Sequence, residues 1–244
     1  GGDEFRPDIV IFINGLPLSY IEVKQPNAIR DGKTAIQSEQ SRTAVRFENR
    51  RFRRFNNITQ LISFSDNLPY ISGQGQQKQG SFYCSNAFSK TKFNAFKEER
   101  EEELIYSIRS LGEEEIDAVL KDVNRFALKS QPEFKTNQDP STPCNTFISS
   151  LYQKERLLFL LRYGLAYVEE HSKDGTIQLQ KHVMRYPQFF ATKAIEDAIG
   201  KGVKKGVIWH TQGSGKTALS YFNIRYLTNY FSKQEIVPQF YFVV

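Results

Sequence analysis

Residues 7 to 24 read Pro-Asp-Ile-Val-Ile-Phe-Ile-Asn-Gly-Leu-Pro-Leu-Ser-Tyr-Ile-Glu-Val-Lys, and the fold of the chain follows from this stretch. Two runs of apolar and β-forming residues flank Asn14-Gly15, a pair that predicts a tight β-hairpin turn. Side chains alternate between the two faces of a strand, so Glu22 and Lys24 share one face. Charged groups in a strand otherwise fit for burial cost free energy unless they bind something. We therefore expect a hairpin with a functional site at its open end.

The same reasoning constrains the register of the hairpin. A simple two-residue turn pairs residues whose numbers sum to 29, which points Asp8 away from Glu22. A common site for both carboxylates needs an even sum, with Asp8 opposite Glu22 at 30. Pro17 has no N–H to give to a ladder, and prolines in strands lie at edges or bulges. We predict a three-residue loop or a bulge between Asn14 and Leu18.

Three charged side chains of this hairpin, Asp8, Glu22 and Lys24, form a pattern with chemical meaning. Two carboxylates can hold a hard divalent cation, and a neighbouring lysine can position a water and offset charge on a phosphoryl oxygen. The pattern resembles the PD-(D/E)xK nuclease motif. That resemblance implies that all three residues are catalytic and that Asp8 and Glu22 bind Mg²⁺. The alternative is a charged strand end with an incidental ion pair, because Glu-x-Lys is common in strands.

A helix is predicted over residues 31 to 49. Related nucleases often place a Gln on this helix with a Tyr four residues later, which makes Gln37 and Gln40 accessory candidates. Ser41 and Ala44 stand where the Tyr would be, so the sequence does not choose between the two glutamines.

Next comes an arginine-rich stretch interleaved with phenylalanines. Its candidate DNA contacts are Arg50, Arg51, Arg53 and Arg54. These side chains either lie on DNA phosphates while the rings pack inward, or form the solvated basic face of an amphipathic helix end. The sequence favours neither interpretation.

Composition sets further limits. The length of 244 residues suits one large domain or two smaller ones, and 33 basic against 27 acidic residues fit a polyanionic partner. No apolar run approaches the ~20 residues of a membrane span, and no signal peptide is visible. Cys84 and Cys144 lack metal-site spacing, so we expect a reduced, cytoplasmic protein.

The rest of the chain predicts a mixed α/β organisation. The expected elements are strands over 59–65, 81–85, 165–169 and 177–180, with helices over 93–129, 147–163 and 189–201. Residues 130–146 carry three prolines and many small polar residues, as linkers do. We therefore expect a first domain over 1–129, preceded by N-terminal structure, and a second over 147–244.

A second motif lies near the end. Gly206 to Trp209 predict a short strand that runs into a Gly-rich turn and then a helix from Ala218 to about Tyr230, the context that a Walker A loop requires. The predicted nucleotide-binding residues are Gly213, Ser214, Gly215, Lys216 and Thr217. Lys216 would reach the β- and γ-phosphates of ATP, and Thr217 would ligate its Mg²⁺.

Together, two strings resemble the restriction (R, or motor) subunit of type I restriction-modification enzymes. They are Phe12 to Leu18 ahead of Glu22-Val23-Lys24, and Trp209 to Thr217. The resemblance implies a nuclease domain on a mixed central sheet, followed by the opening of a RecA-like parallel-sheet lobe of a superfamily 2 helicase. It also implies Mg²⁺- and ATP-dependent cleavage and translocation of duplex DNA, with methyltransferase and specificity subunits as partners. Gln188 would then recognise adenine, although a Gln after Pro187 is also an ordinary helix start.

No DEAD/DEAH-type motif follows the loop, and Phe240 to Val244 predict the next strand of the sheet. We expect the chain to be part of a longer motor and not a competent ATPase alone. Two alternatives remain open: a non-catalytic module that binds DNA and ATP, and an ATP-dependent nuclease-helicase of another repair or phage-defence class.

Overall fold

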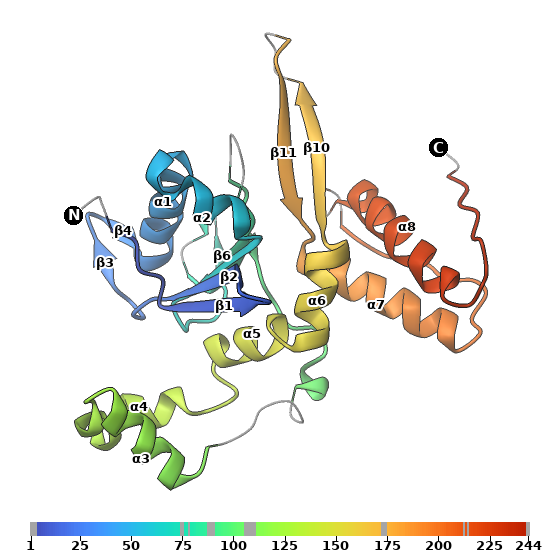
Figure 1. The fold of residues 1–244 in the computed structure, drawn as a ribbon. Coiled ribbons are helices and arrows are strands. Elements are labelled where there is room, and N and C mark those ends of the chain that lie inside the picture. Colours follow the sequence, from blue (N-terminus) through green and yellow to red (C-terminus); the bar gives the residue numbers. More distant parts are fainter. Residues whose placement is uncertain are drawn as a thin grey trace.

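The computed structural model describes residues 4–73, 76–77, 79–86, 91–104, 111–171, 175–211, 213 and 215–242. Strands and helices mix along the whole chain (Figure 1). The strands are β1 (Ile9–Ile13), β2 (Leu16–Val23), β3 (Ile29–Arg30), β4 (Lys33–Thr34), β5 (Leu61–Ser65), β6 (Ser72–Gly73), β7 (Gln76–Gln77), β8 (Ser81–Cys84), β9 (Asn94–Ala95), β10 (Leu165–His171) and β11 (Ile177–Val183). The α-helices are α1 (Ala35–Glu48), α2 (Arg53–Ile58), α3 (Glu113–Asp122), α4 (Pro132–Asn137), α5 (Pro143–Leu151), α6 (Lys154–Tyr163), α7 (Tyr186–Gly200) and α8 (Lys216–Ser232). The 3₁₀ turns are η1 (Arg50–Phe52), η2 (Glu101–Glu103) and η3 (Phe126–Ser130).

The β1–β2 hairpin changes register part-way along. Its pairs are Ile9–Ile21, Val10–Tyr20, Ile11–Ser19, Phe12–Pro17 and Ile13–Leu16. The first three pairs sum to 30 and the last two to 29, so Leu18 is an extra residue in β2, a β-bulge. The predicted departure from an ideal hairpin between Asn14 and Leu18 is therefore confirmed. Continuing this register beyond β1 places Asp8 opposite Glu22.

A five-stranded sheet in the order β1-β2-β5-β8-β9 forms the first half of the molecule. β2 and β5 run parallel, and the other neighbours are antiparallel, so the sheet is mixed as expected. The parallel pair is joined through α1 and α2, as parallel strands require a crossover. All of β5 is buried, and its two serines have hydrogen-bond partners: Ser63 Oγ accepts from the Tyr152 hydroxyl and Ser65 Oγ lies 2.8 Å from Ser81 Oγ.

The sequence prediction of helix over 93–129 is wrong for its first part. Asn94 and Ala95 pair with β8, and only η2 follows before residue 104. Residues 105–110 lie outside the described part of the chain. The expected linker over 130–146 also contains helix, because Pro132 and Pro143 begin α4 and α5. Proline is well tolerated at the first helical position, where its missing N–H has no intrahelical partner.

The helix expected over 147–163 is two helices that meet at Tyr152 and Gln153. The Tyr152 hydroxyl lies 2.9 Å from Ser19 Oγ and donates to Ser63 Oγ at 2.8 Å, which ties this break to the sheet. Antiparallel β10 and β11 then project as a long hairpin at the top of Figure 1, while α7 and α8 lie side by side on the right.

One hydrophobic core joins the sheet to these later helices. Its buried members come from β5, β8 and α5 to α8, and include Leu61, Tyr83, Phe147, Phe189 and Phe222. The Tyr83 hydroxyl donates to the Met184 carbonyl at 2.8 Å, directly before α7. The α3–α4 region, in contrast, stands apart at the lower left of Figure 1.

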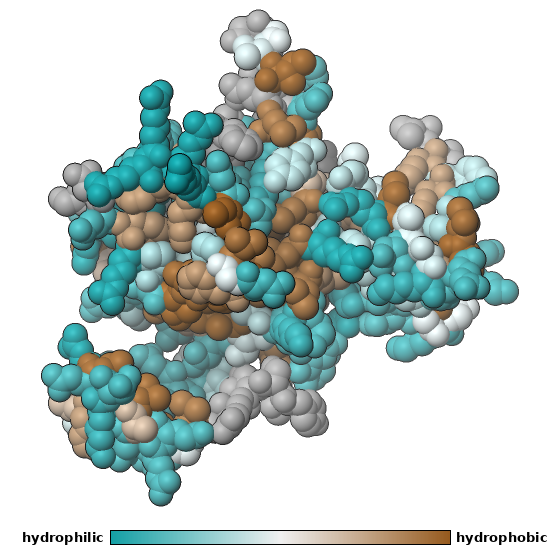
Figure 2. Space-filling view, in the orientation of Figure 1, coloured by the Kyte–Doolittle hydropathy of each residue, from teal (hydrophilic) through white to brown (hydrophobic). Residues whose placement is uncertain are grey.

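Two predicted strands are absent from the described residues. Gly206 to Trp209 and Phe240 to Phe242 have no strand pairing, and Trp209 is 91% exposed. A strand needs a neighbouring strand for its backbone groups, and neither segment has one here. Val243 and Val244 lie outside the described residues. Apolar surface is visible over the segment after α8 in Figure 2.

No helix within the described ranges combines the length and the apolar character that crossing a membrane would take. Cys84 and Cys144 are both buried free thiols.

Candidate functional site

Asp8, Glu22 and Lys24 lie together where β1 begins and β2 ends. Glu22 is only 4% exposed, whereas Asp8 is exposed just ahead of β1. The Asp8 Oδ2 atom accepts a hydrogen bond from the backbone N–H of Val23 at 2.8 Å. The backbone N–H of Lys24 donates to the Ser65 carbonyl at 2.8 Å, so the pairing with β5 extends one residue beyond β2. Backbone bonds on both sides thus hold this short segment in place.

Glu22 and Lys24 belong to a closed ring of four charges that includes Glu39 and Arg46 of α1. Lys24 Nζ donates to Glu22 Oε2 at 2.5 Å and lies 3.1 Å from Glu39 Oε2. Arg46 Nη1 lies 2.6 Å from Glu39 Oε1 and 4.0 Å from Glu22 Oε1. Carboxylates and cations alternate around the ring, which compensates their burial.

The sequence reasoning did not find Glu39 and Arg46. Their spacing of seven residues, two helical turns, places them on one face of α1. That spacing is common on any helix, so only the tertiary fold shows that this face meets Glu22.

Burial raises the pKa of the Glu22 carboxyl, while its hydrogen bond with Lys24 acts in the opposite direction. Its Oε1 atom is buried and has no hydrogen-bond partner within the described part of the chain. A buried carboxylate oxygen without a hydrogen bond fits a hard divalent cation, which would take it as a ligand. No group of three or more His, Cys, Asp or Glu side chains with metal-binding geometry occurs in the described ranges.

The two glutamines proposed as accessory residues lie on α1. Gln37 forms the capping box of this helix: Thr34 N donates to Gln37 Oε1 at 3.1 Å, and Gln37 N donates to Thr34 Oγ1 at 3.3 Å. Gln40 is half-buried and follows Glu39 directly. The structure therefore gives Gln37 a role in starting the helix.

The arginine-rich stretch forms η1 and α2. All four candidate arginines are exposed: Arg50, Arg51, Arg53 and Arg54. Phe52 and Phe55 instead pack near Phe5, with ring centroids 5.9 Å from it in both cases. Hydrophilic side chains project at the upper left of Figure 2, where α1 and α2 lie, and apolar surface is visible below them.

The Gly-rich loop precedes α8. Gly213 and Gly215 adopt positive φ angles of 77° and 85°, which glycine tolerates without steric cost. Lys216 begins the helix, and its Nζ donates to the carbonyls of His210 at 3.1 Å and Thr211 at 3.4 Å. The Lys216 side chain thus folds back onto the backbone of His210 and Thr211. Ser214, predicted to bind nucleotide, lies outside the described residues.

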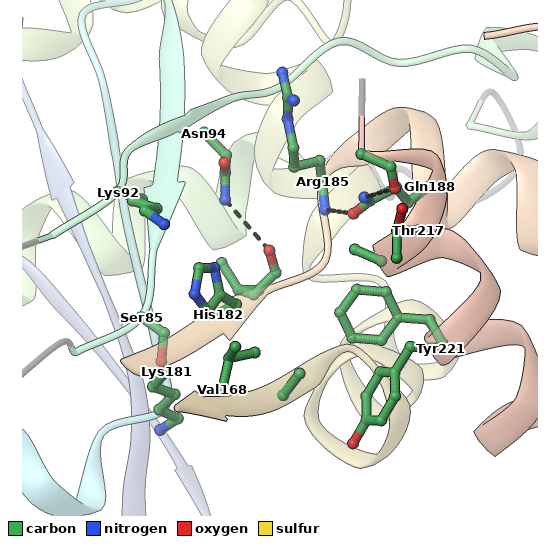
Figure 3. Close-up of a pocket in the computed structure, with 15 residues that line it drawn as sticks. Ser85, Lys92, Asn94, Val168, Lys181, His182, Arg185, Gln188, Thr217 and Tyr221 are labelled. Carbon is green, nitrogen blue, oxygen red and sulfur yellow. Dashed lines mark hydrogen bonds between the residues drawn. The ribbon is translucent and has the colours of Figure 1, made fainter. Parts of the chain in front are cut away.

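Gln188 lies against this loop, as Figure 3 shows. It is 2% exposed; its Nε2 donates to the Gly215 carbonyl at 2.9 Å, and its Oε1 accepts from Arg185 N at 2.8 Å. Arg185 Nη1 donates to the Gly213 carbonyl at 3.2 Å. Two side chains at the start of α7 therefore shape the loop.

A cavity of about 540 Å³ opens beside the loop (Figure 3). Gly215, Thr217 and Tyr221 line it on one side, and β8, β9 and the β10–β11 hairpin supply the other. Its lining includes Lys92, Lys181 and Arg185, and no Asp or Glu among the described residues that border it. The charge balance suits an anionic ligand.

Lys181 connects this cavity to the sheet. Its Nζ donates to Gln60 Oε1 and, at 2.9 Å, to Asn86 Oδ1. Both acceptors are neutral amides, and burial lowers the pKa of Lys181 to about 8.

Comparison with known proteins gives matches to two families. Residues 1–102, which contain Asp8, Glu22, Lys24 and Glu39, match the family described as the type I restriction enzyme R protein N terminus. The chain carries the N-terminal region of a type I restriction enzyme R protein. Residues 187–241 of this R-protein region, which contain the Gly-rich loop, match the SWI2/SNF2 ATPase family.

Three curated relatives of the R-protein region come from Methanocaldococcus jannaschii. The protein named as the type I restriction enzyme MjaVIIP endonuclease subunit is 42% identical over 88 residues, which is 33% of this chain and 8% of that protein. The MjaIXP subunit is 23% identical over 89% of this chain and 18% of its own length. The MjaVIIIP subunit is 25% identical over 95% of this chain and 17% of its own. The chain thus spans less than a fifth of each relative, and no solved structure gives a significant match.

Proposed function

We propose that this R-protein region is the Mg²⁺-dependent endonuclease of a type I restriction enzyme and carries the ATP-binding loop of its DNA motor. The observation that supports the nuclease most strongly is the bulged hairpin, whose register of Ile9 with Ile21, continued by one residue, would set Asp8 opposite the buried Glu22 that contacts Lys24. A pure binding module has no need of a buried carboxylate and lysine in this geometry.

In this proposal Asp8 and Glu22 hold the divalent cation through their carboxylate oxygens. The bound cation would polarise the scissile phosphodiester and lower the pKa of a bound water. Lys24 positions the attacking water and offsets the charge that develops on the phosphoryl oxygens. The exposed arginines of η1 and α2 hold the DNA backbone, a contact that positions duplex DNA without reading its sequence. Recognition of the DNA site belongs to a specificity subunit, in complex with a methyltransferase subunit.

The second part of the proposal concerns ATP. The phosphates bind at Gly213, Ser214 and Gly215, with Lys216 turned from its carbonyl partners to the β- and γ-phosphates. Thr217 ligates the Mg²⁺ of the nucleotide, and Gln188 contributes to the adenine side of the site. The cation-lined cavity beside Thr217 supports an anionic ligand here. Hydrolysis would drive translocation of duplex DNA in the full-length protein.

Separating the two activities tests the proposal. In the full-length protein, Asp8→Ala and Lys24→Ala are each expected to reduce DNA cleavage at least about 100-fold while DNA-stimulated ATP turnover continues. Lys216→Ala is expected to remove both, since cleavage follows translocation. Lys233→Ala at the exposed other end of α8 is the matched control and should change neither. Normal cleavage by either nuclease-site variant, or normal ATP turnover by Lys216→Ala, would refute the corresponding half.

A further inference from the structure

Two residues of α1, Glu39 and Arg46, have no part in the function proposed above, yet they belong to the ring of charges that contains Lys24. Glu39 is 1% exposed, and its two carboxylate oxygens have different surroundings. Oε1 contacts Arg46 Nη1 at 2.6 Å and accepts from Thr43 Oγ1 at 3.4 Å. Oε2 lies 3.1 Å from Lys24 Nζ, but it has no hydrogen-bond partner within the described part of the chain.

Lys24 therefore stands between two carboxylates and donates to only one of them. Its Nζ hydrogen bond goes to Glu22 Oε2 at 2.5 Å. A buried carboxylate oxygen without a hydrogen bond costs free energy. Glu39 Oε2 is therefore able to accept a hydrogen bond from Lys24. A small rotation of the Lys24 side chain would satisfy it, because the ion-pair distance is already 3.1 Å.

Arg46 keeps Glu39 in this orientation. Besides its contact with Glu39 Oε1, the Arg46 guanidinium carbon lies 4.1 Å from the centroid of the Phe5 ring. The Arg46 carbonyl accepts from Asn56 Nδ2 at 2.8 Å, which ties the end of α1 to α2. Since Oε1 is held by Arg46, Oε2 is the oxygen that faces Lys24.

We infer that Glu39 is a positioning residue of the nuclease site, and that it holds Lys24 in place when Glu22 turns its oxygens to a divalent cation. This inference rests on the proposed nuclease function. Without Glu39, Glu22 is the only carboxylate among the described residues in contact with Lys24, so the lysine and the cation compete for the same oxygens. With Glu39 present, Lys24 keeps an ion pair beside the reacting phosphate. The Glu22 oxygens are then free to bind the cation.

Direct binding of Mn²⁺ to the full-length protein, without nucleotide, tests the inference through a double-mutant cycle. The proteins are the unmodified protein, Glu39→Gln, Lys24→Met and the double variant, with free Mn²⁺ followed by electron paramagnetic resonance. Glu39→Gln is expected to weaken Mn²⁺ binding roughly 10-fold, because Lys24 then competes for Glu22. In the Lys24→Met background the same change is expected to cost less than about 2-fold. A residue that acts through Lys24 has no effect once Lys24 is gone.

Glu48→Gln is the matched control, because it removes the same charge from an exposed position at the end of the same helix. It should leave Mn²⁺ binding unchanged. Should Glu39→Gln fail to fold, Glu39→Asp retracts the carboxylate by one methylene and is expected to show the same dependence on Lys24.

Equal losses in both backgrounds would overturn the inference, since Glu39 would then act on the cation itself as a ligand or a nearby charge. Unchanged binding in Glu39→Gln would overturn it as well. If the unmodified protein binds no Mn²⁺ at this site, the proposed nuclease function fails along with the inference, whereas the first two outcomes leave that function intact.

Discussion

Glu22 and Lys216 belong to equally short motifs, yet they lie in different surroundings. Glu22 is 4% exposed, in a strand paired with β1 on one side and β5 on the other. Lys216 is exposed and follows a segment in which Trp209 is 91% exposed and pairs with no described strand. The proposed nuclease site is therefore preorganised by its own backbone, whereas the Gly-rich loop is held mainly by Gln188 and Arg185. Backbone pairing with neighbouring strands, more than the motif itself, therefore decides how firmly each site is held.

The two regions nonetheless share one hydrophobic core, and the largest expected effect tests this. Phe147 is 1% exposed and packs within that core, so Phe147→Ala should lower the free energy of unfolding by about 3–5 kcal/mol. Trp209→Ala removes an even larger ring but should stay within about 0.5 kcal/mol. Urea denaturation measures both. A larger loss from Trp209→Ala would mean that the segment before the loop is packed in solution.

The next effect concerns Lys181, whose amide partners Gln60 and Asn86 lie just before β5 and just after β8. Its pKa is lowered to about 8 in the folded protein, against an ordinary value of 10.5, so between these pH values the unfolded chain binds more protons. The free energy of unfolding should therefore rise as pH increases from 8 to 10.5, by up to about 3 kcal/mol from this group. Lys181→Met should remove that rise.

Denaturation at pH 7.5 and 10.5 measures the pH effect, and the exposed Lys201→Met is the control. Equal pH dependence in the unmodified protein and in Lys181→Met would show that Lys181 is solvated, and that the hairpin packs less closely on the sheet than the structure shows.

The smallest effect separates the two glycines of the loop. A Cβ at Gly215 would lie 2.5 Å from Gln188 Nε2, whereas a Cβ at Gly213 meets no atom within 4 Å. Both substitutions strain a positive φ, at about 1 kcal/mol each. Gly215→Ala should weaken binding of a fluorescent ATP analogue about 5-fold more than Gly213→Ala. Equal losses would indicate that Gln188 does not shape the loop.

The sequence predicted local features of these regions but not the contacts between distant segments. The bulge at Leu18 was predictable because Asp8 and Glu22 had to share a face, and a hairpin is a local structure. Glu39 and Arg46 were not, because no spacing rule says which face of a helix meets a charged strand. The strand expected at Gly206 to Trp209 did not form, because an apolar run needs a neighbouring strand and sequence pattern alone does not show one. Pro132 and Pro143 indicated a linker, whereas they mark helix starts.

Glu22 is proposed to bind the divalent cation that DNA cleavage requires. The most direct test measures cleavage of plasmid DNA by the full-length enzyme complex across a Mg²⁺ titration. Glu22→Gln keeps the size of the side chain and removes its charge, and Glu48→Gln makes the same change at an exposed position. We expect Mg²⁺-dependent cleavage by the unmodified protein and by Glu48→Gln, and a loss of at least about 100-fold in Glu22→Gln with ATP turnover retained. Cleavage by Glu22→Gln at the unmodified rate, with the same Mg²⁺ dependence, would contradict the account.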